Sequence, residues 1–137
     1  VVRELESIEQ QIAMLDKLDP QLFLEYSLRD FETGKDEMGN MISAWQCADK
    51  EALSASIFAS QTAESVNLKE RAGIDAINDE LFTQRNLHMA DGIEEFVRTG
   101  SGAWFVVVGS GHLLGEGSVV DLLQQRGYEV SPVRMQP

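Results

Sequence analysis

The chain has 137 residues, and its 11 Lys and Arg against 23 Asp and Glu give a formal net charge of −12. A composition of 43% hydrophobic and 25% charged residues is that of an ordinary folded protein, which excludes a wholly disordered or low-complexity chain. The acidic excess argues against nucleic acid as a partner, because binding to a phosphate backbone depends on clustered Lys and Arg. We also expect no membrane insertion, since no apolar run approaches the ~20 residues that cross a bilayer.

The chain begins with a predicted short strand over residues 1–6. A capping box, Ser7-Ile8-Glu9-Gln10, indicates that a helix starts at Ser7, which places Glu6 in the turn between strand and helix. Apolar residues at helical spacing from Val1 to Leu15 favour the alternative, a helix from the first residue. We prefer the capping box.

Residues 7–98 form the predicted helical region. Asp19-Pro20 has the pattern of an N-cap followed by a first helical residue, and Gly34 is expected to end that helix. Asp49 is a candidate cap for a further helix, and a weaker helical pattern covers the 60s. The sequence therefore predicts several amphipathic helices in this region.

Two polar residues interrupt the apolar stripe of the last predicted helix. Arg85 and Asn86 fall on the face that also carries Phe82, Met89 and Ile93. An inward-facing guanidinium needs a carboxylate or other acceptors, because an unpaired buried charge is very costly. Arg85 is either half of a structural ion pair at the edge of the core or part of a functional site.

The last part of the chain predicts a βαβ unit over residues 103–133. Ala103–Val108 is apolar on both alternating faces, as in a central strand covered on both sides. A glycine-rich turn follows, then a helix capped by Ser118, and Tyr128–Val133 has the pattern of a second strand. The expected fold class is α/β, a mostly helical insertion followed by this βαβ unit.

His112 lies in the glycine-rich turn, where open α/β sheets collect their ligands. Gly109 and Gly111 would let the backbone come close to a bound cofactor. A dinucleotide fingerprint is disfavoured, since the spacing of Gly109, Gly111 and Gly115 is one residue too long. From these residues alone, His112 is as well explained by a hydrogen-bonded structural role as by a functional one.

Parallel strands would bring Glu6 and His112 to one edge of the sheet, close to Arg85 and Asn86. Glu6 and His112 are then candidate ligands of a divalent metal, with Arg85 and Asn86 orienting a carboxylate or a polarised carbonyl. Two ligands are too few, because a catalytic zinc-type site usually takes three from the protein and one water. The chain looks one ligand short.

Several short motifs of this chain occur together in one known family. In order they are Leu5-Glu6-Ser7 with Gln10; Trp45 with Asp49; Arg85-Asn86-x-x-Met89-Ala90; Val108-Gly109-Ser110-Gly111-His112-Leu113 with Gly115; and Leu122-Leu123 before Arg126-Gly127-Tyr128. With them the chain resembles the carboxy-terminal half of the TraB/GumN family domain, a family that includes PrgY and the Tiki metalloproteases.

The resemblance implies an α/β fold with two Gly-x-x-His motifs that form a metal site with a Glu, an Arg and an Asn. This chain carries the second motif, Gly109 to His112, and no counterpart of the first. Tiki-like members imply metal-dependent peptide hydrolysis, and PrgY-like members imply restraint of a peptide pheromone. The family also favours an extracytoplasmic location.

We therefore predict part of a metal-dependent peptidase that acts on a peptide or protein. His112 would bind a divalent metal, Glu6 would be a second ligand or the general base, and Arg85 with Asn86 would stabilise charge on the substrate carbonyl. An amino-terminal half would complete the site, so the 137 residues alone should be inactive. The alternative is a non-catalytic module that binds a peptide or protein, with Arg85 holding a carboxylate. A third alternative is a homo-oligomer formed through the open sheet edge.

Overall fold

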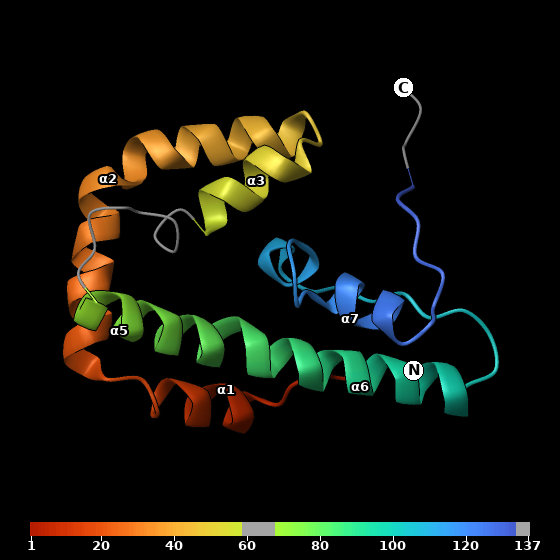
Figure 1. Ribbon diagram of the computed structural model, residues 1–137. Coiled ribbons are helices and arrows are strands. Elements are labelled where there is room, and N and C mark those ends of the chain that lie inside the picture. Colours follow the sequence, from red (N-terminus) through yellow and green to blue (C-terminus); the bar gives the residue numbers. More distant parts are fainter. Residues whose placement is uncertain (59–67, 134–137) are drawn as a thin grey trace.

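The computed structural model describes residues 1–58 and 68–133, which form helices joined by turns and extended segments (Figure 1). The helix expected in the 60s lies largely outside them. The described elements are six α-helices, one π-helix and one 3-10 helix: α1 (Ile8–Leu15), α2 (Pro20–Gln46), α3 (Lys50–Ile57), α5 (Leu68–Asn78), η1 (π, Asp79–Thr83), α6 (Gln84–Thr99), η2 (3-10, Ser110–Leu113) and α7 (Val119–Gln125).

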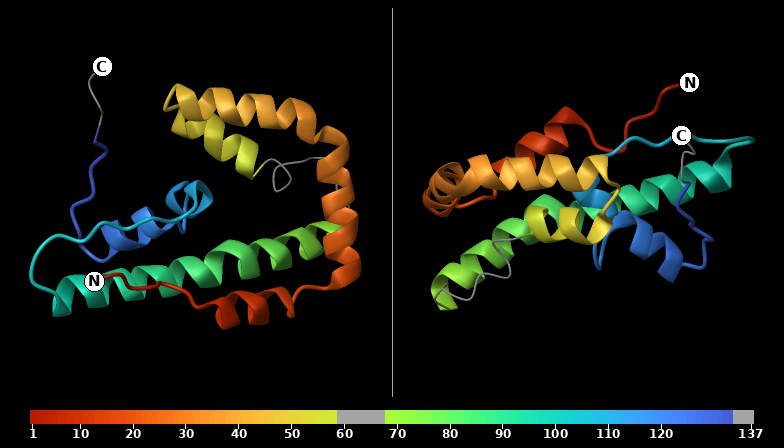
Figure 2. Two further views of the ribbon diagram at one scale, coloured as in Figure 1. Left: turned by 180° about the vertical axis from the view of Figure 1, so that it is seen from behind. Right: turned by 90° about the horizontal axis from the view of Figure 1, so that it is seen from above.

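A long helical run made of α5, η1 and α6 forms the base of the molecule (Figure 1). Helix α1 lies along one side of this run, and α2 leads away from it, changes direction and carries α3 packed against it. Helix α7 and η2 lie on the other side of α6 (Figures 1 and 2). Elements from the start and from the end of the chain therefore both lie against this run.

Four predicted helix starts are confirmed, including that of α7 (Val119–Gln125) at Ser118. The Ser7 hydroxyl accepts a hydrogen bond from the Gln10 backbone N–H, and the Gln10 side chain accepts one from the Ser7 N–H, as a capping box requires. Asp19 caps α2 and Asp49 caps α3 through their carboxylates. Each cap depends on residues no more than three positions apart, which is why the local sequence is sufficient to predict it.

The expected helix end at Gly34 is wrong. Helix α2 continues through Gly34 to Gln46, a length of 27 residues. A glycine inside a helix costs about 1 kcal/mol relative to alanine. Glycine keeps its backbone N–H, so no helical hydrogen bond is lost. The helix can therefore continue when the residues before and after the glycine are helical.

The expected α/β class is also wrong. The described residues contain no strand, and the segments predicted as strands, 1–6, 103–108 and 128–133, are extended but form no ladder. An extended segment becomes a strand only when a second backbone lies about 5 Å away to exchange hydrogen bonds. Without that neighbour there is no βαβ unit among these residues. They also offer no sheet edge for a homo-oligomer.

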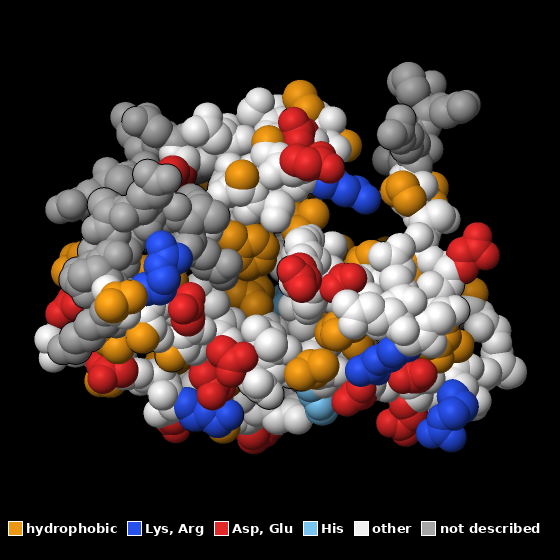
Figure 3. All heavy atoms as spheres, in the orientation of Figure 1, with side chains coloured by type: hydrophobic (Ala, Val, Ile, Leu, Met, Phe, Trp, Pro, Cys, Tyr) orange, Lys and Arg blue, Asp and Glu red, His pale blue; other side chains and the backbone are white. Residues whose placement is uncertain are grey.

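The apolar surface of the chain is only partly covered. The accessible surface is 10302 Å², against about 7,100 Å² expected for a compact protein of 15.2 kDa. Phe105 and Val107, in the extended segment 103–108, are 92% and 76% exposed. Figure 3 shows further apolar side chains in the hollow between α3 and the α5–α6 run. In the described residues, no helix is both long and apolar enough to span a membrane.

Side-chain contacts attach the end of the chain to α6. The Arg126 guanidinium binds Asp91 at 2.7 Å and Glu94 at 3.0 Å, and the Tyr128 hydroxyl donates to Glu94 at 3.2 Å. Gly127, between them, has a φ of +92° that favours glycine, and it follows the end of α7. The Arg126-Gly127-Tyr128 motif therefore holds α7 against α6.

Candidate functional site

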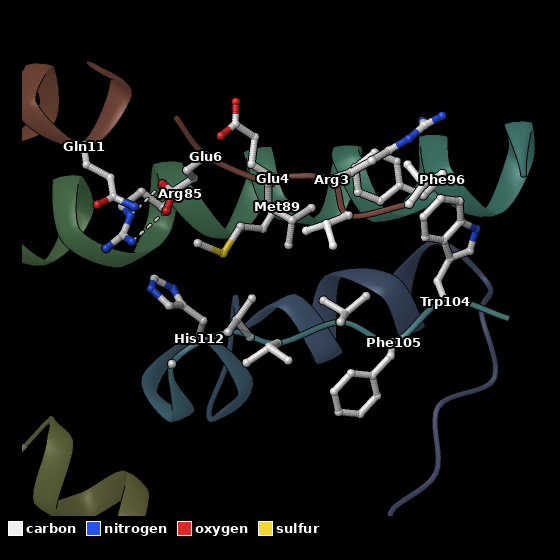
Figure 4. A pocket seen from close by; sticks show the side chains of 17 residues that line it. Arg3, Glu4, Glu6, Gln11, Arg85, Met89, Phe96, Trp104, Phe105 and His112 are labelled. Carbon is white, nitrogen blue, oxygen red and sulfur yellow. Dashed lines mark hydrogen bonds and ion pairs between the residues drawn. The ribbon is translucent and has the colours of Figure 1, made fainter. Parts of the chain in front are cut away.

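A cavity of about 600 Å³ lies between the extended segments 1–6 and 104–109, along α6 (Figure 4). Glu6, Arg85 and His112 line it. The two extended segments bring Glu6 and His112 to the same end of the cavity, as the strand prediction expected, although neither segment is a strand. Asn86 adjoins this group and lines a neighbouring cavity.

Glu6 and Arg85 form a bidentate ion pair at this end of the cavity. Arg85 Nε donates to Glu6 Oε1 and Nη2 donates to Oε2, both at 2.7 Å. The side chains are 9% and 22% exposed, so the pair is largely shielded from water. Of the two alternatives that the sequence gave for Arg85, the structural ion pair is therefore present, and Glu6 is the partner.

The ion pair stabilises the charged form of both side chains. The two hydrogen bonds from Arg85 hold the pKa of the Glu6 carboxyl below its ordinary value of 4.5, despite partial burial. Glu6 in turn raises the pKa of the Arg85 guanidinium. Glu6 is therefore ionised at neutral pH, and both of its oxygens already accept hydrogen bonds from Arg85.

The π-helix η1 lies directly before Arg85 and Asn86. Its wider turn changes the register between α5 and α6, and such turns are frequent at functional sites. Arg85 Nη1 donates to the backbone carbonyl of Leu81, in η1, at 3.1 Å. This bond fixes the guanidinium from behind while Glu6 holds its other edge. The sequence pattern of apolar residues continues through η1, and it therefore gave no indication of the π-turn.

Asn86 connects His112 to the turn before α7. His112 Nδ1 lies 2.7 Å from Asn86 Oδ1, and Asn86 Nδ2 donates to the carbonyl of Gly117 at 2.9 Å. Asn86 is 4% exposed and His112 is 7% exposed. Among the described residues, His112 Nε2 has no hydrogen-bond partner, so one ring nitrogen is engaged and the other is open.

His112 is held neutral by its surroundings. Burial lowers the pKa of the imidazole below its ordinary value of 6.5, and the charge of Arg85 lowers it further, while Glu6 acts in the opposite direction. Only one of the two ring nitrogens then carries a proton at neutral pH. When that proton is on Nδ1, the open Nε2 is able to accept a proton or bind a metal.

Two glycines were predicted to approach a cofactor, and at one of them close packing explains why a larger residue would not fit. A Cβ on Gly111 would lie 2.7 Å from Cε1 of Phe82, whereas a Cβ on Gly109 would meet only His112 Cδ2 at 3.7 Å. The Phe82 ring packs against the His112 imidazole, with ring centroids 5.5 Å apart. The backbone at Gly111 therefore approaches an aromatic ring that supports His112.

The far end of the cavity is aromatic, and sequence reasoning missed it. The rings of Phe96 and Trp104 stack with centroids 5.2 Å apart, and the Arg3 guanidinium lies 5.4 Å and 5.5 Å from their centroids (Figure 4). A cation over an aromatic face is attracted to it. Arg3 and Trp104 lie far apart in the sequence, and no sequence pattern connects them.

The described residues do not by themselves fit a metal ion. They contain no group of three or more His, Cys, Asp and Glu side chains placed to hold one. His112 Nε2 is an open donor, but both Glu6 oxygens are bound to Arg85. One open imidazole is fewer ligands than the three that catalytic zinc-type sites take.

Comparisons with curated proteins and with solved structures give no match to this chain. A comparison with protein families does: the description TraB/PrgY/gumN family matches residues 1–132. The matched range contains the whole cavity and every residue of the Glu6–Arg85 and Asn86–His112 pairs. The chain therefore belongs to the TraB/PrgY/gumN family.

Proposed function

We propose that this chain contributes one wall of a peptide-hydrolysing site, in which His112 Nε2 is the proton-accepting atom. One observation carries the proposal: a buried, neutral imidazole has one nitrogen held by Asn86 and the other open, on the wall of a cavity. A neutral imidazole with an open nitrogen can remove a proton from an attacking water.

Arg85 supports the same chemistry through its remaining hydrogens. Its guanidinium has five N–H groups, of which two bind Glu6 and one binds the Leu81 carbonyl. The other two are left for an acceptor such as the carbonyl oxygen of a peptide. Glu6 then has the role of orienting Arg85 and balancing its charge.

A metal ion could take part in this chemistry only if other residues supplied further ligands. The described residues supply one open donor, so the other ligands would have to come from outside them. Because the residues at hand do not complete such a site, His112, Arg85 and Glu6 are assigned roles that hold without a metal.

The test is hydrolysis of a peptide mixture by the full-length protein, followed by mass spectrometry. His112→Ala should abolish the cleavage products, while His88→Ala should retain them, because His88 is exposed and lies outside the cavity. Metal analysis of both variants belongs to the same experiment. Cleavage by His112→Ala at the wild-type rate, or no cleavage by the wild type, would contradict the proposal.

A second candidate, a non-catalytic peptide-binding module, is favoured by the shape of the cavity. Two extended segments line it, and their backbone groups form no ladder in the described residues. An extended peptide placed between them could pair with both and cover apolar residues such as Phe105. Peptides that bind with equal affinity to wild type and His112→Ala, without being cleaved, would identify this function.

A further inference from the structure

The Asn86 side chain forms hydrogen bonds both to the His112 imidazole and to the turn before α7. Its amide lies between His112 Nδ1, at 2.7 Å, and the carbonyl oxygen of Gly117, at 2.9 Å. It does not line the cavity that holds Glu6, Arg85 and His112. Asn86 therefore acts on the cavity through another residue.

Donor and acceptor chemistry fixes the direction of both hydrogen bonds. A backbone carbonyl only accepts, so the amide NH₂ of Asn86 must face Gly117. The amide oxygen is then turned toward His112, and it also only accepts. The proton on the imidazole must consequently be on Nδ1.

The Gly117 carbonyl is itself held in place. Gly117 has a φ of +70°, and its N–H donates to Asp121 Oδ2 at 2.8 Å. Ser118, the N-cap of α7, is 2% exposed and accepts from the Asp121 N–H at 3.2 Å. The turn therefore presents its carbonyl to Asn86 from a fixed position.

We propose that Asn86 is a positioning residue that holds His112 as the Nδ1-protonated tautomer and turns the Nε2 lone pair to the cavity. The role rests on the proposed function, since Nε2 is the atom assigned there to accept a proton. Free histidine prefers the opposite tautomer, with the proton on Nε2. The contact with Asn86 therefore decides whether the open nitrogen is a base or a donor.

The packing of Phe82 is consistent with this role. Its ring lies 5.5 Å from the imidazole and tilted by 51°, so it fills the space beside the ring without offering a hydrogen bond. Phe82 restricts the rotation of His112, and Asn86 selects which nitrogen is protonated. The two contacts are independent and can be removed separately.

The experiment is ¹⁵N NMR of the labelled protein above neutral pH, in which long-range couplings from the ring protons distinguish the two tautomers. The wild type should show the proton of His112 on Nδ1. Asn86→Ala should move it to Nε2. Asn86→Asp should keep it on Nδ1, because a carboxylate oxygen also accepts that hydrogen bond, even though the bond to Gly117 is lost.

Asn78→Ala is the matched control. Its Nδ2 atom is buried and has no hydrogen-bond partner among the described residues, and Asn78 lines the same neighbouring cavity as Asn86. This variant should leave the tautomer of His112 unchanged. In the peptide assay, Asn86→Ala should lose kcat by about 10–100-fold, as loss of an orienting partner does elsewhere, and Asn78→Ala should not.

The wild-type spectrum decides the inference even if Asn86→Ala does not fold. A proton on Nε2 in the wild type would overturn it, as would an unchanged tautomer in a folded Asn86→Ala. An Nδ1 proton in a protein that cleaves no peptide would support the inference and overturn the proposed function. The two failures are thus distinguishable.

Discussion

Arg85 holds both carboxylate oxygens of Glu6 at 2.7 Å, across a sequence separation of 79 residues. This pair joins the start of the chain to α6 and forms one end of the cavity (Figure 4). Removing one partner leaves the other poorly solvated, which costs more than the pair itself contributes. The pair should therefore be visible in stability measurements as well as in activity.

Glu6→Gln should lower the free energy of unfolding by about 1–3 kcal/mol, because the Arg85 charge loses its ionised partner. Urea denaturation followed by circular dichroism measures the change. Glu4→Gln is the matched control: Glu4 also lines the cavity but is exposed and has no ion pair among the described residues. Equal stability of the two variants would show that the ion pair contributes nothing.

The ion pair should also make the free energy of unfolding depend on pH in the acidic range. Because Arg85 holds the pKa of Glu6 below 4.5, the unfolded chain binds a proton at Glu6 before the folded protein does. This contribution is complete above about pH 4.5 and is lost as the pH falls through the lower folded pKa. The stability difference between wild type and Glu6→Gln, measured by urea denaturation at several pH values, should shrink in that acidic range. A difference that stays constant down to pH 3 would contradict the assignment.

His112 should contribute a second, less acidic dependence. Burial lowers its pKa below 6.5, so the folded protein resists protonation that the unfolded chain accepts. The free energy of unfolding should decrease as the pH falls below about 6.5, and His112→Gln should remove that part of the decrease. Urea denaturation of both proteins between pH 8 and pH 5 measures it. Parallel curves for the two proteins would mean that His112 is not held neutral.

Gly111→Ala should destabilise the protein by about 1–3 kcal/mol, as overpacking does in a closely packed site. Its Cβ would lie 2.7 Å from Phe82 Cε1, so the ring that supports His112 must move. Gly109→Ala is the control, since its Cβ would meet only an ordinary contact at 3.7 Å and its φ of −61° suits alanine. Thermal unfolding compares the two. If both variants have the same melting temperature, the close approach of Gly111 to Phe82 does not exclude a larger residue.

Much of the helical structure could be predicted because its signals are local. Ser7, Asp19, Asp49 and Ser118 each satisfy a backbone N–H two or three residues away, and each does so in the structure. The sequence also indicated Arg85 and His112, which line the cavity, as a polar residue in an apolar stripe and a histidine in a glycine-rich turn. The family was identified from the same short motifs.

The contacts within the site could not be predicted, because they join distant residues. Glu6 and Arg85 were expected together, but nothing in the sequence indicated that both carboxylate oxygens are engaged. Asn86 was expected to face a substrate and instead contacts His112 and Gly117. The π-turn before Arg85 has the same apolar pattern as an α-helix, so the register change was invisible.

The sequence was sufficient for properties that depend on a few neighbouring residues: helix caps, the acidic character and the extended, apolar nature of segment 103–108. It was not sufficient to decide whether that segment is a strand, because a strand exists only through hydrogen bonds to another backbone, which its own residues cannot supply. The same holds for the site. Residue types indicated which groups meet, and only the three-dimensional arrangement decided that Glu6 binds Arg85 while Asn86 binds His112.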